Sequence, residues 1–106
     1  MLDPVTFGQA ISQKRKELGM SQKELAAKIK REDGEPISPQ YLNDIEHDRR
    51  SPSSDLMVQQ FAKVLDLNSD YLYYLAGRIP TDILSKNLPP EKVEKLMVAF
   101  RRQIKS

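Results

Sequence analysis

The 106-residue chain contains no cysteine, which excludes disulfides, thiolate zinc sites and cysteine nucleophiles. Its single histidine cannot form a histidine metal cluster, and its four glycines leave little material for a phosphate-binding loop. No apolar run approaches the roughly 18 residues that a membrane-spanning helix needs. No Ser-His-Asp arrangement and no carboxylate pair framed by apolar residues is visible. We therefore expect no enzyme, no cofactor or metal, and no membrane partner.

An excess of charge of one sign is also missing. Seventeen Lys and Arg oppose fifteen Asp and Glu, for a net charge of +2. Residues 1–77 hold ten basic and twelve acidic residues, whereas residues 78–106 hold seven basic and three acidic ones. Any nucleic-acid binding by the longer segment must therefore come from the local placement of charge. The first residues show no basic segment followed by an apolar stretch, so no signal peptide is visible and we expect a cytoplasmic location.

Helix signals are dense, and strand signals are nearly absent because no segment sustains an alternation of polar and apolar residues. The sequence therefore predicts an all-α fold. Asp3-Pro4 predicts the start of a first helix and Gly19 its end. Ser21 and Glu24 form a capping box that predicts the start of a second helix. The residues expected to face inward on these two helices are Phe7, Ala10, Ile11, Leu18, Leu25, Ala26 and Ile29.

Three further helices are predicted before Gly77. Ser38-Pro39, a cap followed by proline at the first helical position, predicts the third, and a turn over residues 49–54 precedes the fourth. Asn68-Ser69 starts the fifth, which ends at Gly77. The main apolar residues of these helices are Tyr41 at an edge, Leu42, Ile45, Leu56, Phe61, Ala62, Leu65, Tyr71, Leu72 and Leu75. We interpret Tyr71, Tyr73 and Tyr74 as core and dimer-edge residues rather than a stacking platform for single strands.

The predicted third helix carries polar residues along one side. They recur at spacings of i, i+3, i+4 and i+7, which places them on one face: Gln40, Asn43, Asp44 and His47. Amide side chains can form two hydrogen bonds with adenine in the major groove, and a carboxylate can accept one from cytosine or disfavour other bases. The basic pair Arg49-Arg50 follows on a turn, a suitable position for phosphate contacts. A pair such as His47-Asp48 also occurs in metal phosphohydrolases, which need several further histidines.

These residues belong to a longer pattern. It comprises Phe7, Ile11, Arg15, residues 18–22, residues 24–26, Ile29, residues 37–46, residues 49–52, Leu56 and Ala62. Over residues 5–77 the sequence resembles the Cro/C1-type (phage-repressor-like, XRE) helix-turn-helix family. The resemblance implies a five-helix, lambda-repressor-like domain that dimerises and binds double-stranded operator DNA.

The resemblance also implies roles for individual residues. The residues expected to face the major groove are Ser38, Pro39, Gln40, Asn43 and Asp44. The residues expected at the DNA backbone are Gln22, Tyr41, Arg49, Arg50 and Ser51, and His47 is a phosphate-facing or plain surface residue. Arg15 is expected to pair with Glu46, which would tie the first helix to the end of the third.

One segment departs from the family pattern. Seven residues, 30–36, separate Ile29 from Ile37, where family members usually have a much shorter turn. The second helix could run one turn further, or the insertion could form a loop. We expect Lys28, Lys30 and Arg31 to face phosphate, whereas the three acidic residues Glu32, Asp33 and Glu35 face solvent. A longer turn here could alter the tilt of the third helix and, with it, the base contacts.

Residues 78–106 form a separate C-terminal tail in this interpretation, next to a DNA-binding domain over residues 1–77. A short helical turn is expected at residues 81–85, and Pro89-Pro90 predicts the start of a final amphipathic helix. Its apolar stripe consists of Val93, Leu96, Met97, Phe100 and Ile104. The stripe could pack on the same domain or on a second chain, and the complete five-helix domain before it favours a partner role. The basic end formed by Arg101, Arg102 and Lys105 is most simply solvated.

The sequence thus predicts a sequence-specific DNA-binding transcriptional regulator. We expect a repressor that binds a palindromic operator as a homodimer. The alternative is an antitoxin-like module that holds a protein partner through residues 78–106 and regulates its own promoter.

Overall fold

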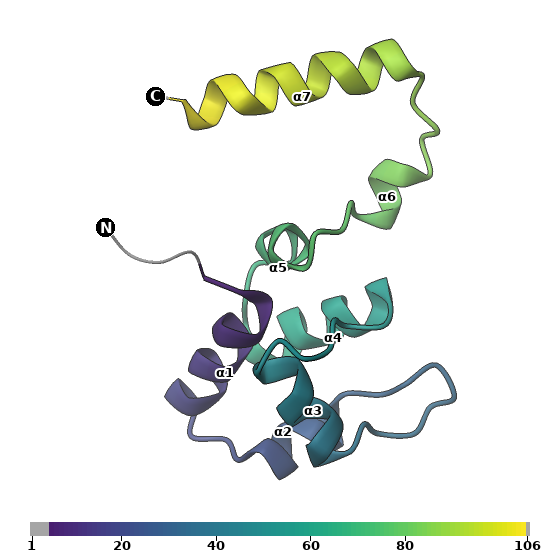
Figure 1. Cartoon of the computed structure of the whole chain (residues 1–106). Coiled ribbons are helices and arrows are strands. Elements are labelled where there is room, and N and C mark those ends of the chain that lie inside the picture. The colour runs from purple at the N-terminus through teal and green to yellow at the C-terminus, as the bar shows by residue number, and fades with distance from the viewer. Residues whose placement is uncertain (1–4, 106) are drawn as a thin grey trace.

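The computed structural model describes residues 5–105, which contain seven helices and no strand (Figure 1). In chain order the helices are α1 (Phe7–Glu17), α2 (Gln22–Lys28), α3 (Pro39–Glu46), α4 (Asp55–Leu65), α5 (Ser69–Ala76), α6 (Thr81–Leu84) and α7 (Pro90–Ile104). The predicted all-α class is confirmed. Over the same residues, no helix combines the length and apolarity that a membrane crossing requires.

Side-chain caps define three of the predicted helix starts. Ser21 accepts a hydrogen bond from the Glu24 backbone N–H, and the Glu24 carboxylate accepts one from the Ser21 N–H, each at 3.0 Å. Ser38 caps α3 by accepting from the third helical N–H at 3.0 Å, and Asn68 caps α5 in the same way at 2.9 Å. Gly77 ends α5 with a φ of 68°, which favours glycine. The predicted starts of α2, α3 and α5 are therefore confirmed.

The start of the first helix differs from its prediction. Asp3 and Pro4 lie outside the described residues, and Thr6 has an extended backbone, so α1 begins at Phe7. The Thr6 hydroxyl accepts from the Gln9 N–H, and the Gln9 side chain accepts from the Thr6 N–H, both at 3.1 Å. This capping box makes the start at Asp3-Pro4 wrong: it holds Thr6 outside the helix.

One apolar core joins α1 to α5. Its members include Phe7, Ile11, Leu25, Ile29, Leu42, Ile45, Met57, Phe61, Leu65, Leu72 and Tyr73. The rings of Phe7 and Phe61 meet edge to face, with 5.8 Å between their centroids. Helical spacing predicts Leu18 in this core, but Leu18 is 46% exposed, because it caps the end of α1 where the chain turns away. Leu56 is also exposed, at the solvent side of α4.

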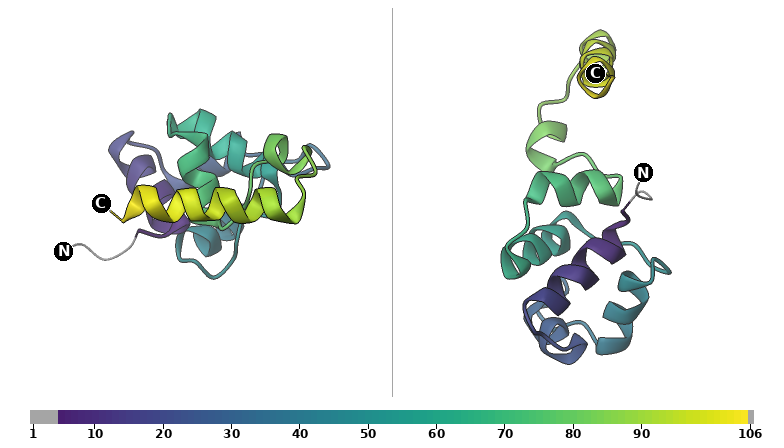
Figure 2. Two further views of the ribbon diagram at one scale, coloured as in Figure 1. Left: turned by 90° about the horizontal axis from the view of Figure 1, so that it is seen from above. Right: turned by 90° about the vertical axis from the view of Figure 1, so that its left-hand side faces the viewer.

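Helix α7 lies apart from the body formed by α1 to α5. Figure 2 shows α7 running across the body when the molecule is seen from above, and lying beyond α5, joined through α6, when it is seen from the side. The radius of gyration is 15.5 Å, against about 13 Å for a compact domain of about 100 residues. The C-terminal helix therefore extends the molecule and adds little to its core.

Candidate nucleic-acid interface

Helices α2 and α3 meet at a hydrogen bond that closes the insertion at its base. The Ile37 N–H donates to the Ile29 carbonyl at 2.9 Å, and both side chains are buried. Helix α2 ends at Lys28, so the alternative in which it runs one turn further is wrong. Residues 30–36 form a loop with one antiparallel bridge between Lys30 and Pro36.

The insertion is fixed to α4 by one side chain. The Lys30 N–H donates to Oε1 of Gln60 at 2.7 Å, and Nε2 of Gln60 donates back to the Lys30 carbonyl at 2.9 Å. At the tip, Gly34 has a φ of 86° and the Arg31 N–H donates to the Glu35 carbonyl at 2.8 Å. Sequence reasoning missed this role of Gln60 because nothing in the local sequence links residues 30 positions apart.

The predicted polar face of α3 points away from the core. Gln40 and His47 are exposed, and Asn43 and Asp44 are half-buried. Ser38 and Pro39, at the start of the helix, are also exposed. Asp44 is held on both sides, because its Oδ1 accepts from Nε2 of Gln40 at 3.1 Å and from Nε of Arg49 at 3.2 Å. The insertion leaves Gln40 open to solvent.

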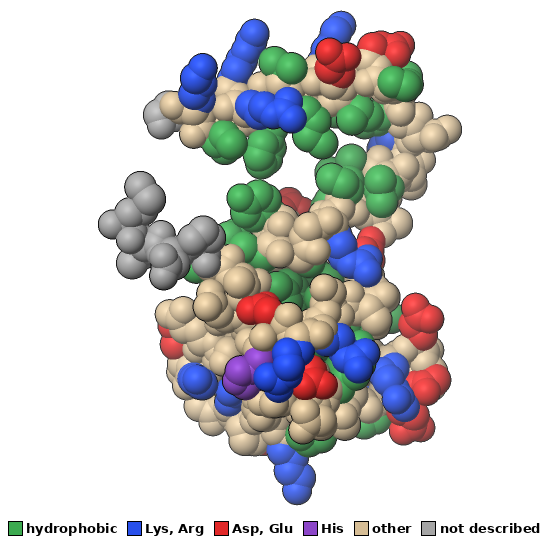
Figure 3. Space-filling model, viewed as in Figure 1, with side chains coloured by type: hydrophobic (Ala, Val, Ile, Leu, Met, Phe, Trp, Pro, Cys, Tyr) green, Lys and Arg blue, Asp and Glu red, His purple; other side chains and the backbone are tan. Residues whose placement is uncertain are grey.

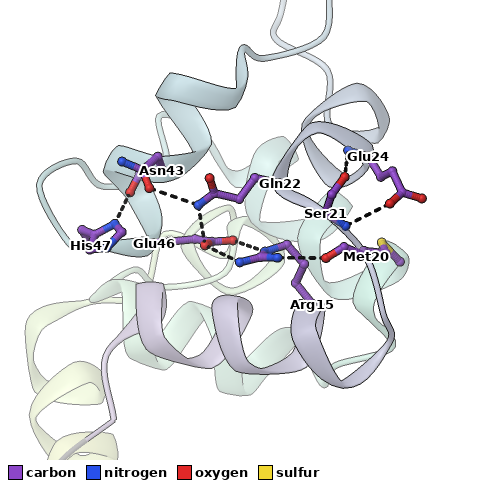
Figure 4. Close-up of polar contacts among 8 residues, drawn as sticks. All are labelled: Arg15, Met20, Ser21, Gln22, Glu24, Asn43, Glu46 and His47. Carbon is purple, nitrogen blue, oxygen red and sulfur yellow. Dashed lines mark hydrogen bonds and ion pairs between the residues drawn. The ribbon is translucent and has the colours of Figure 1, made fainter.

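Asn43 is held from the opposite direction by α2. Nε2 of Gln22 donates to Oδ1 of Asn43 at 3.1 Å and to Oε1 of Glu46 at 2.9 Å, as Figure 4 shows. These bonds keep the amide nitrogen of Gln22 within the protein. Because Oδ1 of Asn43 accepts from Gln22, this amide has a preferred orientation before any ligand arrives.

Beneath this face, Glu46 forms an ion pair with Arg15. This is the pair that the family resemblance implied. Nε and Nη2 of Arg15 donate to the two carboxylate oxygens at 2.7 and 3.1 Å, and Nη1 donates to the Met20 carbonyl at 2.8 Å. The side chains are 10% and 2% exposed. Burial acts to raise the pKa of Glu46, but hydrogen bonds from Arg15 and Gln22 and the Arg15 charge outweigh it, and the pKa lies below its ordinary value.

Basic side chains lie at the C-terminal end of α3. Arg49, Arg50 and Ser51 are exposed, and the guanidinium of Arg50 lies 4.7 Å from the ring centroid of Tyr41. In Figure 3, blue Lys and Arg side chains gather beside the purple histidine and one red carboxylate. This surface combines hydrogen-bonding side chains with local positive charge. It does so although residues 1–77 as a whole hold ten basic and twelve acidic residues.

The α3–α4 turn is held close against α1. Asp48 has a φ of 59°, and its carboxylate accepts from the Thr6 hydroxyl at 2.6 Å and the Gly8 N–H at 3.1 Å. A Cβ at Gly8 would lie 2.3 Å from the Ile45 carbonyl oxygen, so only glycine fits this contact. Sequence reasoning missed both residues, although a glycine inside a helix signals close packing.

The same contacts separate His47 from Asp48. Nδ1 of His47 lies 2.8 Å from the Asn43 carbonyl oxygen, whereas the Asp48 carboxylate is turned toward α1. Over residues 5–105, no three His, Cys, Asp or Glu side chains are grouped so that they could hold a metal ion. The two neighbours in sequence therefore do not form a joint site.

A comparison with known families agrees with this geometry. Residues 11–72, more than half of the chain, match the family model described as helix-turn-helix. The comparisons with curated proteins and with solved structures give no match. The matched range runs from α1 to α5 and includes the whole α2–α3 unit. The chain therefore belongs to the Cro/C1-type helix-turn-helix family of DNA-binding transcription regulators.

Proposed function

We propose that this regulator is a repressor that binds a roughly palindromic operator as a homodimer. Each protomer would place α3 in a major groove, with half-sites about one helical turn, ~34 Å, apart. The observation that carries the proposal is the outward face of α3, on which Gln40 is exposed and Asn43 is oriented by Gln22. A bound dimer would repress by excluding the polymerase from an overlapping promoter.

Base contacts in this proposal come from the exposed side of α3. Gln40 and Asn43 read base edges, because an amide can donate and accept at adenine. Ser38 and Pro39 enter the groove first, at the N-terminal end of the helix. Asp44 acts mainly by holding Gln40 and Arg49, since its Oδ1 already accepts from both.

Phosphate contacts come from the residues around that face. Arg49, Arg50 and Ser51 bind one strand beyond the end of α3, with Tyr41 beneath the Arg50 guanidinium. His47 lies beside them. Gln22 would contact phosphate through its backbone N–H at the start of α2, because its side-chain nitrogen is engaged by Asn43 and Glu46.

The insertion and the end of α2 contribute through their basic residues and not through their acidic ones. Lys28, Lys30 and Arg31 would approach phosphate, while Glu32, Asp33 and Glu35 face solvent. Arg31 forms an exposed ion pair with Asp33 at 3.3 Å, which must open for Arg31 to bind DNA. An exposed pair is worth little, so this opening is a minor cost.

Selection of bound fragments from a random duplex pool tests the proposal. The expected product is a site with two inverted half-sites separated by one helical turn. A single asymmetric site would contradict the homodimer, and recovery of random sequences would contradict base reading by α3. Placing the selected site over a promoter then measures repression directly.

A second candidate function follows from the uncovered apolar face of α7. An antitoxin-like module would use residues 78–106 to hold a different protein and would regulate its own promoter with residues 1–77. Arg78 and Thr81 both bind the Asp55 carboxylate, so a deletion that removes only the association helix should start after Ser85. Loss of both dimer and operator binding favours self-association, whereas a full-strength dimer without α7 favours a partner protein.

A further inference from the structure

Helix α7 presents an apolar stripe that its own chain covers only in part. The exposed fractions are 39% for Val93, 47% for Leu96, 42% for Met97, 51% for Phe100 and 68% for Ile104. The rings of Phe100 and Tyr74 lie 6.5 Å apart, which places one end of the stripe near α5. A contiguous apolar surface of this kind marks an interaction site in a folded protein.

Helix α5 and the segment that runs into α6 offer a second apolar surface opposite this stripe. Tyr74, Ile79 and Ile83 are 65%, 43% and 46% exposed, and with Met97 and Phe100 they border a groove of about 470 Å³. Figure 3 shows green side chains on both sides of the gap between α7 and the body. Arg78 binds the Asp55 carboxylate at 2.8 Å, which fixes the body side of the groove to α4. The groove is therefore lined by apolar side chains that a further apolar element could bury.

Charged residues along α7 indicate which apolar element covers the stripe and the groove. Glu94 and Arg101 are seven residues apart, so they flank the stripe on the same side. Neither forms an ion pair among the described residues. In an antiparallel pair of helices, residues on the same flank face each other across the interface. A second α7 in that orientation would bring each Glu94 toward the Arg101 of the other copy.

The apolar spacing agrees with this register. When Phe100 of one copy packs between Leu96 and Met97 of the other, Val93 lies opposite Ile104 of the other copy. In that register Glu94 and Arg101 are offset by about two residues, ~3 Å along the helix axis, which their long side chains can span. The hydrophobic and the charged positions thus specify the same arrangement.

We infer that a second copy of this chain covers the stripe, with the two α7 helices antiparallel and two Glu94–Arg101 pairs between the copies. The two α5 helices then complete an apolar core around the paired α7 helices. This inference rests on the proposed homodimer and adds its location and geometry. A parallel pair would instead bring each Glu94 to Lys92 of the other copy and place Arg101 beside Gln103, so a charge reversal at Arg101 separates the two orientations.

Charge reversal in the full chain tests the register. E94R and R101E each create two like-charge contacts, so each variant should dimerise about tenfold or more weakly than the wild type. The double variant E94R/R101E restores both pairs and should dimerise like the wild type. An equimolar mixture of the two single variants should recover dimers. In that mixture one chain carries arginine at both positions and the other carries glutamate at both, so each contact between them joins opposite charges. Sedimentation equilibrium measures all four cases.

Matched controls carry the same charge changes on the opposite face of α7. E91R and R102E should dimerise like the wild type, and circular dichroism checks that every variant keeps its helix content. A wild-type dimer that none of the reversals weakens would overturn the α7 arrangement and leave the homodimer standing. Weakened single variants without recovery in the mixture would also overturn it, in favour of another register or orientation. A wild-type chain that stays monomeric, with and without its operator, would overturn the homodimer itself.

Discussion

Gln22 of α2 donates its side-chain N–H to Oδ1 of Asn43 on α3 at 3.1 Å, and the same nitrogen donates to Glu46 at 2.9 Å. Glu46 is in turn held by Arg15 of α1. Three helices therefore fix the orientation of one amide on the exposed face. Such pre-orientation would lower the cost of ordering Asn43 in the proposed base contact.

Replacing Gln22 with Ala should weaken operator binding by about 1 kcal/mol, roughly fivefold, because Asn43 loses the bond that orients it. The preference for the base that Asn43 contacts should also relax. Gln13→Ala on α1 is a suitable control, since it removes an exposed amide that bonds only within its own helix. Quantitative binding to the selected site and its single-base variants measures both effects. Unchanged base preference would mean that Asn43 does not need Gln22.

Gln40→Ala should cost about 1–3 kcal/mol on the preferred site and relax the preference at one base position. The Asp44 carboxylate keeps its bond from Arg49, so the fold of α3 should not change. Binding to a panel of single-base variants measures the loss of preference. An equal loss on every sequence would show that Gln40 makes no base contact.

Arg49→Ala should weaken binding to all sequences alike and lower the slope of log affinity against log salt by about 0.9. The reason is that a phosphate contact releases one counterion and carries no sequence information. Titrations at several salt concentrations, on the operator and on random duplex, provide the measurement. A loss confined to the operator would assign Arg49 to a base instead.

Arg15→Ala should destabilise the fold by about 3–5 kcal/mol, because it leaves the Glu46 carboxylate buried without its cation. The Met20 carbonyl would lose its donor at the same time. Urea unfolding measures the change. The double replacement Arg15→Met with Glu46→Leu should cost much less, since no charge is left behind. A double variant as unstable as Arg15→Ala would point to a packing role.

Acid should destabilise the fold through the same pair. The pKa of Glu46 lies below its ordinary value of 4.5, because the bonds from Arg15 and Gln22 outweigh the effect of burial. The folded state then binds fewer protons than the unfolded chain, so this stabilisation is present above about pH 5 and is lost as the pH falls through the folded pKa. Glu46→Gln should lower stability at neutral pH and flatten its decline in acid. If stability declines equally steeply with falling pH in the wild type and in Glu46→Gln, Glu46 is not the source of the decline.

Much of the fold could be predicted because its signals are local. Ser21, Ser38 and Asn68 cap helices within three residues of themselves, and the buried stripes follow from helical spacing. The start of α1 was missed although Thr6 and Gln9 form the same kind of box, because Asp3-Pro4 supplied a competing signal. Leu18 lies at the right spacing but one turn beyond the last packed residue.

The rest depends on contacts between distant residues. Gln60 binds the backbone of Lys30, and Asp48 binds Thr6 and Gly8, at separations that no periodicity links. The exposed face of α3 could be predicted from the spacing of Gln40 and Asn43, but the bond that orients Asn43 could not. Helical spacing likewise identified the stripe on α7, yet it cannot say which surface covers a stripe.

The contact between Ile29 and Ile37 has a practical consequence for protein engineering. The seven intervening residues leave and rejoin the scaffold at almost the same point, so their number has little influence on the angle between the two helices. Doubling the length of a flexible loop costs only about 0.6 kcal/mol. An epitope or a fluorescent label could therefore be inserted at the Asp33-Gly34 turn. The exposed face of α3 would stay unchanged, and the label would report DNA binding beside it.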